Sequence, residues 1–158
     1  MKVEFTNPFI KAVTSVIESE IQVKLTRKEL KVKQNPSPSH PTFIIIGVTG
    51  IIKGQVVYSM DWNFAYEVAK AMLPDKLPVE LKRMTNSAVS ELANMITGRA
   101  SIELAGENNV VNITPPAVFT GAPVFYQAGV LQLREMGRDG ALPGTQNLLQ
   151  FGYRQFLA

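Results

Sequence analysis

Hydrophobic residues recur every three or four positions in three segments of the chain, which is the spacing of one face of an α-helix. The first segment opens at Asn7-Pro8, where Asn suits the cap and Pro the first helical position. The second follows Asp61 and runs through Leu73, directly before a proline. The third starts at Pro78 and continues to about Glu103. We therefore expect three helices, the last much the longest.

Other segments carry the β-branched runs or alternating apolar positions that are typical of strands. Residues 43–48 and 53–60 are separated by Thr49-Gly50, a turn sequence, and we expect them to form a hairpin. A helix could also be drawn through the final segment, but Gly152 and two aromatic residues favour a strand there. A short strand is expected within the mixed segment 25–33, where Leu30 and Val32 suggest it, and further strands at 110–113, 124–134 and 149–154. A loop is expected at 35–41 and a glycine-rich turn at 137–144.

The order of these elements is helix, strands, helix, long helix, strands. This order predicts an α/β (α+β) fold in which helices pack over a largely antiparallel sheet. The 158 residues amount to one domain, residues 1–158, and are enough to bury a core without disulfides.

Composition excludes several classes of protein. The chain has no cysteine, which excludes disulfides, thiolate metal sites and cysteine nucleophiles. No apolar run approaches the roughly 20 residues that span a bilayer, so we expect no membrane partner. Glu4 and the amphipathic pattern after it are unlike a signal peptide, and we expect a cytoplasmic protein.

The net charge of +3 does not indicate a nucleic-acid partner. The densest basic stretch lies within residues 24–33, where Glu29 and apolar residues interrupt the cations. No aromatic stacking pattern accompanies it, as nucleic-acid binding would favour. A solvated edge strand or a turn is the better interpretation.

The chain lacks the residues of a self-sufficient hydrolase. His40 is the only histidine and lies between prolines, so we interpret it as a loop residue. Asp61, Asp75 and Asp139 are scattered singly and form no visible cage for Mg²⁺. No glycine-rich phosphate loop or nucleophile elbow is present. Any catalysis therefore completes a site that belongs mostly to another molecule.

The third helix carries the polar residues of greatest interest. A helix turns roughly 100° per residue, so Glu91 and Asn94 lie about 60° apart around its axis. Ser87 and Gly98 fall on the same arc, and the apolar residues between them fall on the opposite one. The helix is thus predicted to be a rigid platform that presents a carboxylate and a neutral amide outward. The alternative is that both are ordinary solvent-facing residues of an amphipathic helix.

The segment Ser87-x-x-x-Glu91-x-x-Asn94 resembles the signature of the CheC/CheX/FliY family of chemotaxis phosphatases. Residues 112–118, a strand running into Pro115-Pro116, resemble a second hallmark of the CheX branch, and the hairpin at 45–58 is similar to its first strand pair. A single such helix also points to this branch, since CheC-like members usually carry two. The resemblance covers about residues 1–135; the proline loop at 35–41 and the tail after Met136 match no motif.

The resemblance implies a CheX-like homodimer that hydrolyses the aspartyl phosphate of a CheY-like response regulator. The regulator would bring the phospho-aspartate and its Mg²⁺, so the chain would need no cofactor of its own. Glu91 would pair with the regulator's active-site lysine, and Asn94 would orient the attacking water. Ser87 and Gly98 would bind the partner or support the pair. The alternatives are a non-catalytic dimeric adaptor of the same fold and a structural relative of flagellar switch components.

Overall fold

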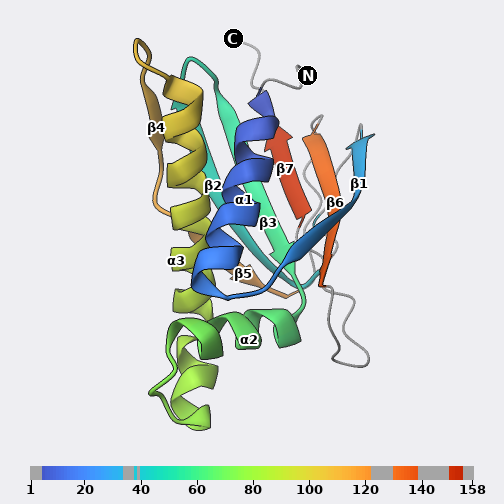
Figure 1. The fold of residues 1–158 in the computed structure, drawn as a ribbon, viewed down its shortest axis with the longest axis vertical. Helices are drawn as coiled ribbons and strands as arrows, with labels where there is room; N and C mark the ends of the chain where they lie inside the picture. The colour runs from blue at the N-terminus through green and yellow to red at the C-terminus, as the bar shows by residue number, and fades with distance from the viewer. Residues whose placement is uncertain (1–4, 34–37, 39, 122–129, 139–149, 155–158) are drawn as a thin grey trace.

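The computed structural model describes residues 5–33, 38, 40–121, 130–138 and 150–154. In this part of the chain, helices α1 and α3 lie side by side over one face of an antiparallel sheet, and α2 crosses one end (Figure 1). The predicted fold class is therefore confirmed. The helices are α1 (Asn7–Glu20), α2 (Trp62–Met72) and α3 (Pro78–Ala105). The strands are β1 (Leu25–Lys33), β2 (Thr42–Gly50), β3 (Gly54–Met60), β4 (Val111–Ile113), β5 (Ala117–Thr120), β6 (Val130–Arg138) and β7 (Gln150–Arg154).

The described strands form one sheet in the order β1-β6-β7-β3-β2-β4, and β5 also pairs with β2. The basic segment at 25–33 is the edge strand β1, as the sequence indicated. The predicted hairpin is confirmed as β2 and β3, with Ile44 opposite Tyr58 and Ile46 opposite Val56. This register places Ile44, Ile46, Val56 and Tyr58 together on the face that the helices cover.

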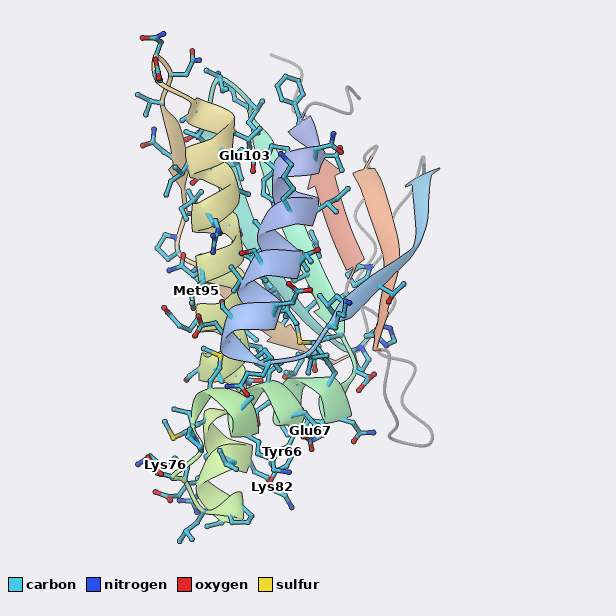
Figure 2. All side chains as sticks on the ribbon, viewed as in Figure 1. Tyr66, Glu67, Lys76, Lys82, Met95 and Glu103 are labelled. Carbon is cyan, nitrogen blue, oxygen red and sulfur yellow. The ribbon has the colours of Figure 1, made fainter. Side chains whose placement is uncertain are left out.

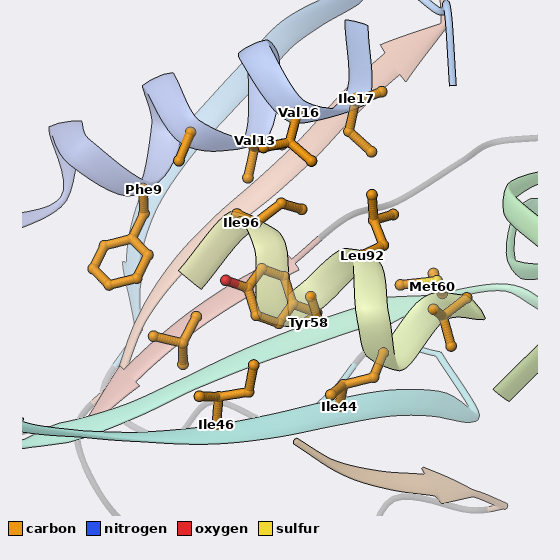
Figure 3. Close-up of a cluster of buried hydrophobic side chains, with 14 of the residues drawn as sticks. Phe9, Val13, Val16, Ile17, Ile44, Ile46, Tyr58, Met60, Leu92 and Ile96 are labelled. Carbon is orange, nitrogen blue, oxygen red and sulfur yellow. The ribbon is translucent and has the colours of Figure 1, made fainter. Parts of the chain in front are cut away.

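The core lies between that face and the two long helices (Figure 3). Ile44 and Ile46 of β2 and Tyr58 of β3 are almost completely buried there. α1 contributes Phe9, Val13, Val16 and Ile17, and α3 contributes Leu92 and Ile96, to the same cluster (Figure 3). Removing these side chains from water holds the helices on the sheet.

The long helix α3 starts at Pro78, as predicted, and ends two residues beyond the expected Glu103. The carboxylate of Glu80 accepts a hydrogen bond of 3.0 Å from the N–H of Leu77, which precedes the first turn. One face of the helix is buried along its length and is rich in small and hydroxyl side chains. That face consists of Leu81, Thr85, Ala88, Val89, Leu92, Ala93, Ile96, Thr97, Ala100 and Ser101.

Three sequence-based boundaries were wrong. The residue that caps α1 is Thr6, and Asn7 already lies inside the helix. β6 continues to Arg138, where a turn was expected from Gly137, because its whole length pairs with β1. β5 was missed because the prolines before it indicated a chain break, yet the chain resumes pairing with β2. Predictions for residues 34–37, 39, 122–129 and 139–149 lie outside the described residues.

The double proline divides β4 from β5 without releasing either from β2. Thr114 continues the pairing with β2 between β4 and β5. Its N–H donates to the Gly47 carbonyl and its Oγ1 accepts from the Gly47 N–H, both at 2.9 Å. A Cβ added to Gly47 would lie 2.9 Å from Cγ2 of Thr114, which is too close. Glycine at 47 therefore permits the contact that fixes Pro115-Pro116 at the sheet edge.

The N-terminus of α2 provides a test of the local structure. A carboxylate oxygen of Asp61 accepts a hydrogen bond of 2.8 Å from the Phe64 N–H. We expect Asp61→Ala to lose about 1 kcal/mol of unfolding free energy, because this end of the helix loses its cap. For a domain of this size the melting temperature falls by about 2–4 °C, measurable by circular dichroism. Asp75→Ala, at an exposed loop position, is the control, and equal shifts in both variants would contradict the capping role.

Candidate functional site

The sequence-predicted residues lie together on the outer side of α3. Glu91 and Ser87 are exposed, and Asn94 and Gly98 are half-buried. The apolar residues between them, Val89, Leu92, Ala93 and Ile96, are buried, so the predicted division into two arcs is confirmed. We call Ser87, Glu91, Asn94 and Gly98 the α3 ridge. Met95, which follows Asn94, marks its place near the middle of the helix (Figure 2).

Neither the Glu91 side chain nor the Asn94 side chain forms a hydrogen bond or an ion pair with another residue that the structure describes. The other two carboxylates of α3 behave differently. Glu103 of α3 binds Lys11 of α1 at 2.6 Å, and Glu80 lies 4.0 Å from Lys76. The side chains of Glu91 and Asn94 therefore retain their full hydrogen-bonding capacity for another molecule.

Gly98 has no structural reason to be glycine within the described chain. A Cβ added to it meets no atom within 4 Å, and its backbone is ordinary helix. Glycine inside a helix costs roughly 0.5–1 kcal/mol relative to alanine. The ridge thus contains a destabilising residue at a point where open space lies outside the helix.

The segment with the double proline lies along α3. β4 and β5 both contact the helix, and Figure 1 shows β4 running beside it. Pro115 is exposed and Pro116 is half-buried, and Thr114 attaches them to β2 as described above. The two sequence features that carried the family resemblance are therefore neighbouring elements in space.

A contact beneath the ridge was missed by sequence reasoning. The hydroxyl of Tyr58 on β3 lies 2.6 Å from Oγ1 of Thr97 on α3, and both side chains are buried. Thr97 Oγ1 also donates to the Ala93 carbonyl at 2.7 Å. Burial raises the pKa of the Tyr58 phenol, and its bond to Thr97 opposes this to a smaller extent. No local pattern could reveal this pair, because its members are 39 positions apart in sequence.

The ridge lies on the outer side of a helix, whereas the usual small-molecule site is a concave pocket. A hollow of about 230 Å³ lies elsewhere, between the end of α1 and α2, and is lined by Ile21, Val23, Phe64, Glu67, Lys70 and Ala71. It includes no residue of α3 and is smaller than the roughly 300–1,000 Å³ of typical ligand pockets. A projecting carboxylate and amide are instead suited to enter the pocket of a larger partner.

Two further classes of site are absent from the part of the chain that the structure describes. Among the residues described here, no three His, Asp or Glu side chains come together as metal ligands do. None of the described helices is long and apolar enough to span a bilayer. His40 is a loop residue, as expected, and its backbone N–H donates to Oγ of Ser59 at 3.0 Å.

Comparison with known proteins gives consistent results. The family described as "Chemotaxis phosphatase CheX" matches residues 42–129, more than half of the chain. "CheY-P phosphatase CheX" of Thermotoga maritima is 35% identical over 82 residues, which are 52% of this chain and 53% of that protein. The match thus spans about half the length of this curated relative.

Solved structures share the fold over almost the whole chain. A CheX structure from Desulfovibrio desulfuricans has a TM-score of 0.78 at 21% identity, covering 97% of this chain and 99% of that one. CheX in a CheX–CheY–BeF₃–Mg²⁺ complex from Borrelia burgdorferi has a TM-score of 0.66 at 21% identity, covering 97% and 98%.

The family match includes the hairpin, α2, the whole of α3 and the Pro115-Pro116 edge. These are the elements that build and support the α3 ridge, and the resemblance seen in the sequence is confirmed. The chain belongs to the CheX family of chemotaxis phosphatases.

Proposed function

We propose that this chain is a phosphatase that removes the aspartyl phosphate from a CheY-like response regulator. The observation that carries the proposal is the pair Glu91 and Asn94, held one turn apart on a long helix with no partner among the described residues. The name of the Thermotoga relative, which states this activity, and the CheY bound in the Borrelia complex support it.

Asn94 is the residue that acts on the attacking water. Phosphoryl transfer depends mostly on positioning and on the placement of charge. An amide offers one acceptor and two donors and carries no charge, so it holds a water in line without repelling the phosphoryl group. An aspartate at the same place would bring a second negative charge, at a cost on the order of 1–4 kcal/mol at contact distance.

Glu91 anchors the regulator. Its exposed carboxylate binds a cation at the rim of the regulator's site, a lysine by family resemblance, through a charge-assisted hydrogen bond. Because one helical turn separates the two residues, binding by Glu91 brings Asn94 to the phosphoryl group. Ser87 extends the contact surface, and Gly98 leaves room for the regulator's loops.

The remaining features of the proposal concern the setting of the reaction. Mg²⁺ belongs to the regulator with the phospho-aspartate, so the proposed reaction needs no metal ligand from this chain. The protein acts in the cytoplasm, where response regulators are found, and as a homodimer, as the family resemblance implies. The outer edge of β1 carries no further described strand, so pairing with a second chain is open to it.

Asn94→Ala tests the catalytic assignment. We expect phosphate release from a phosphorylated CheY-like regulator, at saturating regulator, to slow by about 10²-fold or more, because the water loses its positioning group. The variant is expected to stay folded with no loss of thermal stability, since the Asn94 side chain makes no bond with the described residues and alanine favours a helix. Asn86→Ala, an exposed amide two turns earlier on α3, is the matched control. A wild-type chain that binds the regulator tightly without speeding release would instead identify a non-catalytic adaptor.

Glu91→Ala tests the anchor. The dissociation constant for the regulator, held in its phosphorylated form by beryllofluoride, is expected to rise about 10-fold, since a charge-assisted bond is lost. Isothermal titration calorimetry measures it, and Glu107→Ala, at an exposed position beyond the end of α3, is the control. An unaltered dissociation constant in the Glu91 variant would remove this residue from the interface.

Gly98→Ala tests whether the glycine at this position serves partner binding at a cost in stability. The melting temperature is expected to rise by about 2–4 °C, because alanine favours the helix and its Cβ has open space. Affinity for the regulator is expected to fall, and Gly98→Leu to weaken it further, because the side chain occupies the space of the partner. Binding by the leucine variant as tight as that of wild type would show that the partner does not approach here.

A further inference from the structure

We propose that the hydrogen bond between Tyr58 and Thr97 is a positioning contact that sets the rotation of α3 on the sheet and thereby the place of Asn94 in the reaction. The inference rests on the proposed function, because it assigns these two buried residues a role in the rate of phosphate release.

The contact reaches the backbone next to Asn94. The Thr97 hydroxyl has a single hydrogen, which it donates to the Ala93 carbonyl at 2.7 Å. The bond of 2.6 Å between Tyr58 and Thr97 must therefore be donated by the phenol. The Ala93 carbonyl belongs to the peptide unit that joins Ala93 to Asn94. A short relay of two hydrogen bonds thus connects strand β3 with the peptide that carries the proposed catalytic residue.

The other contacts between α3 and the sheet have little directional preference. The apolar residues that α3 buries around this point are Ala88, Val89, Leu92, Ala93, Ile96 and Ala100. Apolar packing fixes which face of the helix is buried and how closely it approaches, but the hydrophobic attraction is itself non-directional. The ion pair of Lys11 with Glu103 is exposed, and such pairs constrain geometry little. The short hydrogen bond between Tyr58 and Thr97 in the water-free core is directional, unlike the apolar packing.

The size of the effect follows from helix geometry. A side-chain atom at the outer radius of about 5–6 Å moves by about 1 Å when the helix rotates by about 10°. A misplacement of that size can lower the rate of a positioned reaction by about 10²-fold. The anchor residue Glu91 is less affected, because an exposed and flexible carboxylate can adjust to a cation over this distance.

Tyr58 is itself not a proton donor in the reaction. It is 1% exposed, lies between the sheet and α3 (Figure 3), and its pKa is raised by burial. The phenol is therefore neutral throughout the physiological range and acts through Thr97. The aromatic ring fills the core, whereas the hydroxyl is the part that orients the helix.

Tyr58→Phe tests this division, because it keeps the ring and leaves the Thr97 hydroxyl bonded to Ala93. Phosphate release from a phosphorylated CheY-like regulator is measured over a range of regulator concentrations. We expect kcat to fall about 10-fold or more, while KM and the affinity for the beryllofluoride form change less than about twofold. The melting temperature falls by about 2–4 °C for the loss of one buried hydrogen bond.

Three further variants distinguish positioning from stability alone. Thr85→Val removes another fully buried hydroxyl of α3, which donates to the Leu81 carbonyl at 2.8 Å, and is expected to lower stability without changing kcat. Thr97→Ser keeps the hydroxyl and is expected to keep kcat. Thr97→Val removes it and is expected to reproduce the loss, so this pair decides the question if Tyr58→Phe does not fold.

The outcomes separate the two proposals. If the wild-type chain speeds phosphate release and kcat is unchanged in Tyr58→Phe and Thr97→Val, the positioning role is overturned and the proposed function stands. If Thr85→Val lowers kcat as much as these variants do, the effect is one of stability and the inference also fails. A wild-type chain that does not speed release would overturn the proposed function, and the positioning role with it.

Discussion

The burial of one face of α3 against β2 and β3 is the contact on which the rest of the structure depends. Small and branched side chains on that face are removed from water together with Ile44, Ile46 and Tyr58 of the sheet. This burial leaves the opposite side of the helix outward, with Glu91 and Asn94 on it. The same residues that stabilise the fold therefore determine which side of the helix, and hence which polar groups, faces outward.

The outward pair suits a reaction shared between two proteins. Under the proposed function, the partner supplies the phosphoryl group and its cation, and this chain supplies two side chains at fixed separation. Membership of the CheX family and the exposure of Glu91 on α3 support this proposal.

Sequence reasoning succeeded where the determinant is local. The cap at Asp61, the start at Pro78 and the two arcs of α3 follow from residues a few positions apart, and all three are confirmed. It failed where pairing is distant: β5 exists because residues 117–120 meet 42–45 across the chain. The contact between Tyr58 and Thr97 likewise joins residues that are distant in sequence. The sequence could therefore place the proposed reacting groups on a helix, whereas the bond that we propose to orient that helix became visible only in the fold.

The length of α3 has a consequence for how binding occurs. Its 28 residues extend about 42 Å, and Glu91 and Asn94 lie about three turns from either end. Fraying is confined to the terminal turns, so amide exchange near Asn94 requires opening of the whole core rather than a local fluctuation. The backbone of the α3 ridge is thus already ordered in the free chain. If a regulator binds this ridge as proposed, association orders only a few side chains, and encounter rather than folding governs its speed.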